Sequence, residues 1–290
     1  MRRRARSSGM GEEASREAPG SVPRCPLCGG TESRTSYRQG DGGQFEFRRC
    51  LSCRLVWYDP AGGLDQGKYS RSLPDPLSGE GAANTSQTAS WAFIRQAVPK
   101  KGSLLDIGCG NGRLIHLAAG DGWRAEGVEI SHEAAGQVSR RTGLPVHAGL
   151  FPGAMPSLPG KYDLVVLRHV LEHIPDPVAA MEALGSLLAE DGRALLEFPN
   201  IDSLDAGWRR LVGRLGLHRK RYRPGYVPGH CCEYCRGSFE FLLRSSGMVL
   251  ERWETYSSRP CLAPLLRALP VGGKARALVR LEGHRPQGRV

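Results

Sequence analysis

Short apolar runs alternate with longer amphipathic stretches through most of the chain, and this alternation sets the expected fold. The short runs end at glycine, proline or charged residues, which favours buried strands. The stretches between them carry apolar residues at helical spacing. We therefore expect an α/β fold with a doubly wound, mostly parallel sheet. The expected strands are 104–107, 124–130, 144–148, 162–167, 193–198 and 249–256, and the expected helices are 90–98, 114–119, 131–141, 177–188 and 238–247.

The first expected strand runs into a turn that is rich in glycine. Gly108, Gly110 and Gly112 stand at every second position after Asp106. Glycine lacks the side chain that keeps a ligand away from the backbone, so a ligand can approach this turn closely. The helix that begins just beyond it offers unpaired N–H groups and a positive dipole end to an anionic group. A tight turn without a ligand gives the same glycines, so the turn alone establishes no site.

An acidic residue on the second expected strand strengthens the interpretation. Glu129 follows the glycines by about 20 residues, where a doubly wound domain places a carboxylate for ribose hydroxyls. A nicotinamide dinucleotide site usually shows G-x-G-x-x-G, and here the third glycine comes one residue early. The pattern therefore favours a nucleoside ligand other than a nicotinamide dinucleotide.

The run L-D-I-G-C-G-N-G, from Leu105 to Gly112, resembles the first motif of class I S-adenosylmethionine-dependent methyltransferases, whose fold is Rossmann-like. The resemblance implies that the glycines pass under the methionine part of S-adenosylmethionine and that Glu129 holds its ribose. Related enzymes often carry an acid for the adenine amino group after the third strand, but none stands between Gly149 and Asp163, so apolar walls are expected there. The implied cofactor-binding residues are Asp106, Gly108, Cys109, Gly110, Gly112, Glu129, Ile130, Leu150 and Phe151.

The fourth expected strand runs into the segment H-V-L-E-H-I-P-D-P, which begins at His169. It closely resembles the same segment of ubiquinone-biosynthesis O-methyltransferases and of other bacterial small-molecule methyltransferases, and we expect it at the mouth of the site. If it turns helically, His169, Glu172 and His173 share one face. Three roles stay open for these candidate catalytic residues: a general base, a metal site of two histidines and one carboxylate, or shaping of the pocket. The quinone enzymes carry a glutamate where His169 stands, so the metal role is not carried over directly.

Two C-x2-C pairs near the start of the chain predict a zinc ribbon. Cys25 and Cys28 form the first pair, and Cys50 and Cys53 form the second. Four thiolates at such spacing close a tetrahedron around zinc and leave no open position, so the site is expected to be structural. A third pair, Cys232 and Cys235, has no partner pair, and a second zinc site is disfavoured.

The remaining segments complete the expected domain organisation. The insertion after the fifth strand holds a basic aromatic stretch and is expected to form a lid over the substrate. His230 could reach the site from this lid, although a lone histidine is more often structural. The expected divisions are a disordered segment 1–22, the zinc ribbon 23–58, a linker or flap 59–87, the methyltransferase domain 88–258 with the lid at about 199–237, and a basic amphipathic tail 259–290.

Composition indicates the expected compartment and leaves several kinds of partner open. No apolar run approaches the roughly 20 residues of a membrane-spanning helix, and no apolar stretch follows the basic start, so a cytoplasmic protein is expected. The formal net charge is +11, which is compatible with RNA, anionic lipid or a phosphorylated substrate as much as with a solvated arginine-rich surface. The tail is expected to pack on the domain or to touch an anionic membrane.

The sequence therefore predicts an S-adenosylmethionine-dependent methyltransferase with a structural zinc ion, acting on a hydroxyl or sugar carbon of a small molecule. Such a reaction needs little acid or base help, since the sulfonium is already activated. Two alternatives stay open. One is an RNA methyltransferase, suggested by the cysteines and the basic charge. The other is a non-catalytic scaffold that has lost cofactor binding, suggested by the missing adenine acid.

Overall fold

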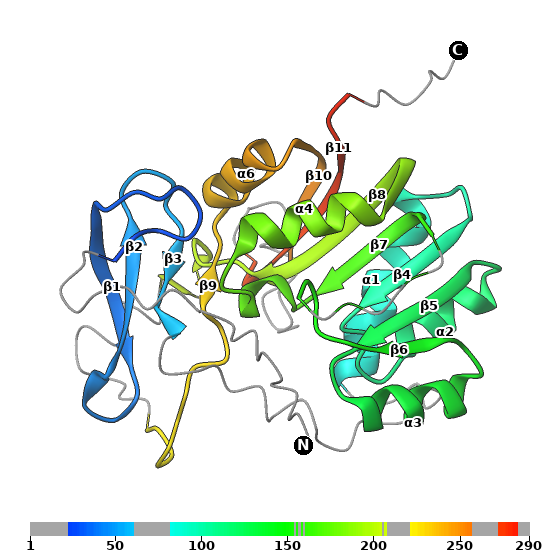
Figure 1. The fold of residues 1–290 in the computed structure, drawn as a ribbon, viewed down its shortest axis with the longest axis horizontal. Coiled ribbons are helices and arrows are strands. Elements are labelled where there is room, and N and C mark those ends of the chain that lie inside the picture. Colours follow the sequence, from blue (N-terminus) through cyan, green and yellow to red (C-terminus); the bar gives the residue numbers. More distant parts are fainter. Residues whose placement is uncertain are drawn as a thin grey trace, which may run out of the picture.

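The computed structural model describes residues 23–60, 82–153, 155, 158, 160–204, 206–207, 221–256 and 272–283. These residues form two sheets that stand side by side in Figure 1. The larger sheet has seven strands in the order β10-β11-β8-β7-β4-β5-β6, and the smaller has four in the order β1-β2-β3-β9. The helices pack against the larger sheet or, for α6, beside it (Figure 1). Of the two N-terminal cysteine pairs, Cys50 ends β2, and the other three cysteines lie in or beside the turns before β1 and after β2.

Five strands of the larger sheet run parallel. The chain first builds outward on one side of β4 and then returns to build β7 and β8 on the other, so the strand order reverses beside β4. Ligands of open α/β sheets bind at such a point, outside the carboxyl ends of the strands. The parallel strands are β4 (Ser103–Ile107), β5 (Arg124–Glu129), β6 (Val146–Ala148), β7 (Tyr162–Arg168) and β8 (Leu188–Pro199).

The two faces of this sheet pack against different helices because neighbouring strand residues point to opposite sides. On β7, Leu164 and Val166 belong to the core that includes helices α1, α2 and α3, whereas Val165 and Leu167 belong to the core that includes α4 and α6. All four side chains are buried. The helices are α1 (Ala82–Ala97), α2 (Arg113–Gly120), α3 (His132–Thr142), α4 (Pro177–Leu187) and α6 (Arg236–Ser245).

Capping residues fix where two of these helices begin. Ser131 accepts a hydrogen bond from the backbone N–H of Ala134 at 3.2 Å and caps α3, as the sequence predicts. Asp176 accepts one from Ala179 at 3.0 Å and caps α4, with Pro177 as its first residue. Both caps stand just after segments of the candidate site, so they set the direction in which the chain leaves it.

The end of the chain differs from the expected amphipathic tail. Lys274–Leu281 forms strand β11, which pairs antiparallel with β8 on one side and with β10 (Met248–Tyr256) on the other. The alternation of arginines with apolar residues that suggested an amphipathic segment is therefore that of a strand, and the sheet does not end at residue 258. Residues 257–271 and 284–290 of the tail lie outside the described residues.

The smaller sheet is built from two distant parts of the chain. Strands β1 (Ser33–Gln39), β2 (Phe45–Cys50) and β3 (Val56–Trp57) come from the N-terminal part, with a 3-10 turn η1 (Asp41–Gly43) between the first two. Strand β9 (Cys232–Glu233) comes from the segment expected to be the lid. Its pairing with β3 ties that segment to the cysteine-bearing strands, and we call the four strands together the four-cysteine sheet.

Several expected segments fall wholly or partly outside the described residues. They are the segment 1–22, most of the linker at 61–81, and residues 205 and 208–220 of the lid, which include Trp208 and the start of the basic run. The last part of the expected linker is helical, since α1 begins at Ala82. Among the residues described, the structure contains no helix with the length and apolarity that a membrane crossing requires.

Candidate functional site

The three glycines after β4 all have positive φ angles, of 73° at Gly108, 57° at Gly110 and 80° at Gly112. Their surroundings differ. A Cβ atom at Gly108 would lie 2.6 Å from Val170, and one at Gly112 would lie 2.3 Å from Val138, so both glycines permit close packing. A Cβ atom at Gly110 would meet nothing within 4 Å. Only Gly110 thus combines the left-handed backbone with open space, which is the geometry that suits close approach by a ligand.

Glu129 lies against this turn. Its Oε2 accepts a hydrogen bond from the backbone N–H of Gly110 at 3.0 Å, and its Oε1 accepts one from Ser131 at 3.4 Å. Burial raises the pKa of Glu129, although the backbone hydrogen bonds work in the opposite direction. The structure therefore brings together the glycine turn and the acid on the neighbouring strand, which the sequence predicts as two parts of one site.

Asp106 and Cys109 flank the first glycine and are both buried. The Oδ1 atom of Asp106 has no hydrogen-bond partner, and burial raises the pKa of this carboxyl to about 7, against the opposing effect of Arg168. The Cys109 side chain turns toward β5, where its Sγ atom would lie 2.7 Å from a Cβ atom at Gly127. Cys109 therefore has only its backbone to offer a ligand, whereas Asp106 has an unsatisfied polar atom.

The other predicted cofactor residues differ in exposure. Ile130 is half-buried just after β5, and Leu150 is 41% exposed. Phe151 is buried and lines a pocket with Met155, Leu158 and residues of α4. Their contact with adenine stays a prediction. Of the two expected apolar walls, the exposed Leu150 has more surface left for a ligand.

The segment after β7 departs from the helical turn that the sequence analysis assumed. His169 has a φ angle of +56°, and only Leu171–His173 form one short 3-10 turn, η4. A left-handed residue bends the chain sharply, so the shared helical face of His169, Glu172 and His173 is wrong as a description of the backbone. The side chains of the first two still meet: His169 Nδ1 lies 3.2 Å from Glu172 Oε1.

Glu172 is the most buried member of this group, with 1% of its surface exposed. Burial works to raise its pKa, but the hydrogen bond from His169 and the nearby His173 and His230 outweigh it, and the pKa is lowered. Glu172 is therefore a carboxylate surrounded by imidazoles. Its Oε2 atom and the Nε2 atom of His169 are buried and have no hydrogen-bond partner.

His230 joins the group from the lid segment. The rings of His173 and His230 lie 4.8 Å apart between centroids, nearly perpendicular to one another. The N–H at Nδ1 of His173 donates a hydrogen bond to the carbonyl of Gly229. From the sequence, His230 is only a side chain that could reach the site from the lid. No local pattern identifies it, because its position depends on how the lid is held.

The four-cysteine sheet holds the lid there. Val56 pairs with Glu233 and Trp57 with Cys232, and the backbone N–H of Tyr58 donates to the carbonyl of Cys231 at 3.1 Å. The N–H of Cys231 in turn donates to the carbonyl of Glu172 at 2.9 Å. A continuous set of backbone hydrogen bonds therefore leads from β3 to the segment after β7.

The four cysteines of the two N-terminal pairs converge. The Sγ atoms of Cys25 and Cys53 lie 3.5 Å apart, as do those of Cys28 and Cys50, and all four lie within 4.8 Å of one another. A zinc ion with Zn–S bonds of about 2.3 Å needs sulfur atoms separated by about 3.8 Å, so the arrangement fits a tetrahedral zinc site. The cysteines of the third pair are buried but are not part of this group.

A buried ion cluster beside the site was missed by the sequence analysis. The carboxylate of Glu197 on β8 pairs with Arg168 at 2.9 Å and with Arg276 at 2.5 Å, and it accepts a hydrogen bond from Ser90 at 2.9 Å. Burial works to raise the pKa of Glu197, but the two guanidinium groups lower it. The cluster joins α1, β7, β8 and β11. An acid inside an expected buried strand was its one visible signal, and Arg276 lay in the segment read as a tail.

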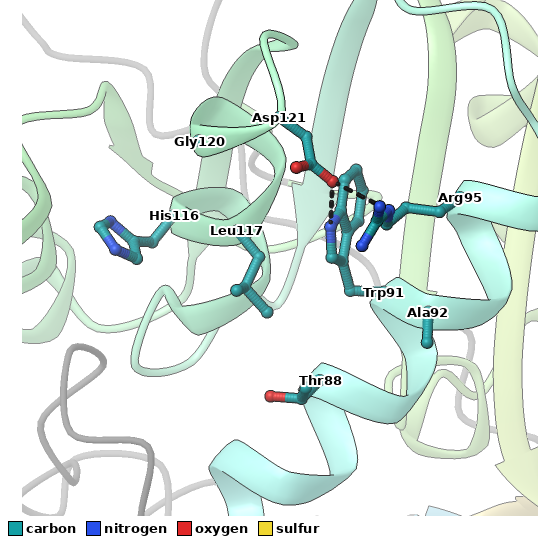
Figure 2. Close-up of a pocket in the computed structure, with 8 residues that line it drawn as sticks. All are labelled: Thr88, Trp91, Ala92, Arg95, His116, Leu117, Gly120 and Asp121. Atoms are coloured by element: carbon teal, nitrogen blue, oxygen red, sulfur yellow. Dashed lines mark hydrogen bonds and ion pairs between the residues drawn. The ribbon is translucent and has the colours of Figure 1, made fainter.

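A pocket between α1 and α2 is lined by none of these groups (Figure 2). Its one acid, Asp121, accepts a hydrogen bond from the indole N–H of Trp91 at 2.8 Å and pairs with Arg95 at 3.3 Å. These contacts fasten the end of α2 to α1. Because the pocket is not at the carboxyl ends of the strands and its acid is engaged, we assign it to helix packing.

Comparison with known proteins agrees with this geometry. A family model described as a methyltransferase domain matches residues 86–252, which is more than half of the chain. An enzyme named ubiquinone biosynthesis O-methyltransferase from Burkholderia vietnamiensis is 36% identical over 93 residues, 30% of this chain and 40% of that protein. A protein of the same name from Xylella fastidiosa is 29% identical over 178 residues, 56% of this chain and 70% of that protein. The chain thus spans about 40% of the length of the first of these relatives.

Two solved structures share the fold. Magnesium protoporphyrin IX methyltransferase from Synechocystis, solved with bound S-adenosylhomocysteine, has a TM-score of 0.50 at 18% identity over 70% of this chain and 84% of that one. A protein from Pyrococcus horikoshii has a TM-score of 0.54 at 16% identity over 74% of this chain and 99% of that one. The predicted α/β fold with a mostly parallel sheet is confirmed.

Proposed function

The chain belongs to the methyltransferase domain family, and we propose that it transfers a methyl group from S-adenosylmethionine to a hydroxyl oxygen of a small molecule. The observation that carries the proposal is the contact between Glu129 and Gly110, which joins the acid expected at the ribose to the one glycine of the turn that faces open space. The names of the relatives support an oxygen acceptor.

The residues present suit this donor. Gly110 leaves room for the ligand, and Glu129 is placed to accept hydrogen bonds from ribose hydroxyls in addition to that from the turn. The unsatisfied Oδ1 of Asp106 is a ready acceptor for the ammonium group of the methionine part. When bound, S-adenosylmethionine supplies an activated methyl group, so the protein needs chiefly to position the acceptor and to exclude water.

We assign the general base to His169. Its Nδ1 faces Glu172, and its Nε2 is buried without a partner at the carboxyl end of β7. An imidazole oriented by a carboxylate through one nitrogen accepts a proton through the other. His169 therefore takes the proton of the acceptor hydroxyl, and Glu172 acts as a positioning residue. A carboxylate that is itself charged stabilises the imidazolium that forms.

We propose that Cys25, Cys28, Cys50 and Cys53 hold zinc. Four thiolates close the coordination shell, so the ion takes no part in the reaction and stabilises the four-cysteine sheet instead. The sheet is small, and its buried side chains, such as that of Phe47, belong to a core shared with the larger sheet and not to a separate one. Through β9 it would also hold the lid segment that carries His230.

Methyl transfer from labelled S-adenosylmethionine tests the function. Phenols and sugars that offer hydroxyl groups should accept label, whereas total transfer RNA should not. A His169→Asn variant should lose at least about tenfold in kcat with the KM for S-adenosylmethionine unchanged, since general base catalysis contributes about 10²- to 10⁴-fold where it is used. The control is His116→Asn, on α2. Label in RNA alone, or in no acceptor with the cofactor bound, would contradict the proposal.

A further inference from the structure

We infer that Glu172, His173 and His230 form a second metal site, which binds a divalent transition-metal ion beside the methyl-transfer site. A carboxylate oxygen and one ring nitrogen from each histidine lie within 4.8 Å of one another. Two imidazoles and one carboxylate are a ligand set that iron(II), cobalt(II), manganese(II) and zinc share. The inference concerns metal binding only, so its test does not depend on the proposed acceptor or on the proposed base.

The carboxylate of this group has a polar atom that the protein leaves unsatisfied. Glu172 is 1% exposed, and its Oε2 atom has no hydrogen-bond partner, while its Oε1 atom faces His169. An unsatisfied charged oxygen in the interior is strongly unfavourable, so such atoms are rare unless a ligand or an ion contacts them. An ion held by Oε2 would remove that cost.

The orientation of His173 also suits a metal ligand. Its Nδ1 carries the proton, because it donates to the carbonyl of Gly229, and this places the lone pair on Nε2. Histidines that bind metals usually donate their other N–H to a carbonyl or a carboxylate in this way. His169 makes a comparable contact, in which its Nδ1 lies 3.2 Å from Glu172 Oε1.

The protein also fixes the backbone beside His230 without help from an ion at this second site. The residue next to it, Cys231, is held on both sides by backbone hydrogen bonds, to Tyr58 of the four-cysteine sheet and to Glu172 itself. A ligand on a lid is imprecise unless its backbone is held, and these bonds supply that precision. Three protein ligands leave positions open, so an ion here can also take water or an oxygen of the acceptor.

A similar pair elsewhere in the chain provides a control. His147 Nε2 on β6 lies 2.8 Å from Glu126 Oε2 on the neighbouring strand β5. This pair offers the same two chemical groups, but it does not belong to any group of three or more metal-binding side chains in the described residues. A metal that bound any imidazole–carboxylate pair would bind there too, whereas the inferred site requires the second histidine.

Cobalt(II) titration of the zinc-loaded full-length protein tests the inference. Cobalt bound by imidazole and carboxylate gives weak visible bands, whereas cobalt that displaced zinc from the cysteines would give intense thiolate charge-transfer absorption. We expect one equivalent of cobalt to bind with the weak visible bands of imidazole and carboxylate ligands, as measured by calorimetry and absorption. His230→Ala and Glu172→Gln should each weaken its binding at least tenfold, and His147→Ala should leave it unchanged.

Two outcomes would overturn the inference. One is the absence of cobalt binding outside the cysteines in the wild-type protein. The other is equal binding in the wild type and in His230→Ala. Because Glu172→Gln alters a buried group, thermal unfolding is measured beside it, and His230→Ala, a half-buried position, carries the test if that variant does not fold.

Discussion

The glycine turn after β4 and the four-cysteine sheet both place a predicted ligand at the ends of strands, but they differ in what holds them together. The turn is fixed by the parallel sheet: Gly108 and Cys109 donate to the carbonyl of Val128, and Glu129 accepts from Gly110. The four-cysteine sheet has two very short strands, and its four cysteine sulfur atoms lie within 4.8 Å of one another. The first site is therefore formed before its ligand binds, whereas we propose that the second forms with a zinc ion.

The difference matters because the two regions meet. Strand β9 belongs to the four-cysteine sheet and begins just after His230 and Cys231, the second of which donates a hydrogen bond to the carbonyl of Glu172. If the four cysteines hold zinc as proposed, a region that depends on a metal ion positions part of a site whose other part does not depend on one. We expect loss of the ion to disturb the lid side of the site and to leave the cofactor side in place.

The largest effect should come from breaking the cysteine group. Cys53→Ser should abolish zinc binding, because it removes one of the four thiolates. The effect on folding should be large, since structural zinc sites contribute about 10–16 kcal/mol to the folding of small domains. Hydrogen exchange should then be fast in β1, β2 and β3 and remain slow in β4. Cys232→Ala is the matched control, since this cysteine is buried in the same sheet but outside the group of four. A Cys53→Ser protein that kept zinc and protection would remove the contrast between the regions.

A glycine substitution tests the other region with a similar design. Gly110 and Gly143 both have positive φ angles and open surroundings, but Gly143 ends α3 and lies outside the turn. Alanine at either position should lower the free energy of unfolding by about 1–2 kcal/mol through backbone strain. Only Gly110→Ala should weaken S-adenosylhomocysteine binding, by about 100-fold or more, which corresponds to about 2.7 kcal/mol. Calorimetry and urea unfolding measure the two effects, and equal affinities would refute the assignment of the turn.

The buried acid of the turn should show in the pH dependence of stability. The pKa of Asp106 is raised to about 7 in the folded protein from an ordinary value near 3.8. Between these values the folded state binds more protons than the unfolded state, so the free energy of unfolding falls as pH rises from about 4 to about 7. Asp106→Asn should remove that part of the decline, on the order of 1–3 kcal/mol, in urea unfolding from pH 5 to pH 8.

Asp163 provides a control of opposite sign. Burial works to raise its pKa, but hydrogen bonds from Ser103 outweigh it and the pKa is lowered. Its contribution to stability is present at neutral pH and is lost as pH falls through the folded pKa. Asp163→Asn should therefore cost stability at pH 7 and less at low pH. If Asp106→Asn and Asp163→Asn change the pH dependence of stability in the same direction, the burial of Asp106 is not the cause of the decline in stability between about pH 4 and about pH 7.

The smallest effect is expected at the border between the regions. Asp202 pairs with Arg49 at 3.1 Å and with Arg54 at 2.9 Å, and the three side chains are partly or largely exposed. Exposed ion pairs contribute less than about 1 kcal/mol. Asp202→Asn should lower the free energy of unfolding by no more than this and leave cofactor affinity unchanged. A larger loss would mean that side chains, and not the β3–β9 backbone pairing, join the regions.

Local patterns predicted much of this molecule. The parallel strands, the cap at Ser131 and the meeting of Glu129 with the glycines depend on sequence periodicity and on the fixed geometry of parallel sheets. The four cysteines followed from their spacing, and the structure brings their sulfur atoms together. In these cases the residues that interact are close in sequence or are related by a regular repeat.

The features that were missed depend on pairing between distant segments. Strand β11 reads as an amphipathic tail because its neighbours β8 and β10 are not visible from its own residues. His230 reaches Glu172 only because β9 pairs with β3, about 180 residues earlier in the chain, and loop closure on that scale leaves no local pattern. The left-handed backbone of His169 was also hidden, since glycine usually fills such positions.

The most direct test of the central claim, that the glycine turn and Glu129 seat the nucleoside cofactor, is a calorimetric titration of S-adenosylhomocysteine. Glu126 stands on the same strand and faces His147, so Glu126→Gln is the matched control for Glu129→Gln. The account predicts binding heat for the wild-type protein and for Glu126→Gln, and at least about a tenfold loss of affinity for Glu129→Gln. A wild-type protein without binding heat, or a Glu129→Gln variant that binds as tightly as the wild type, would contradict it.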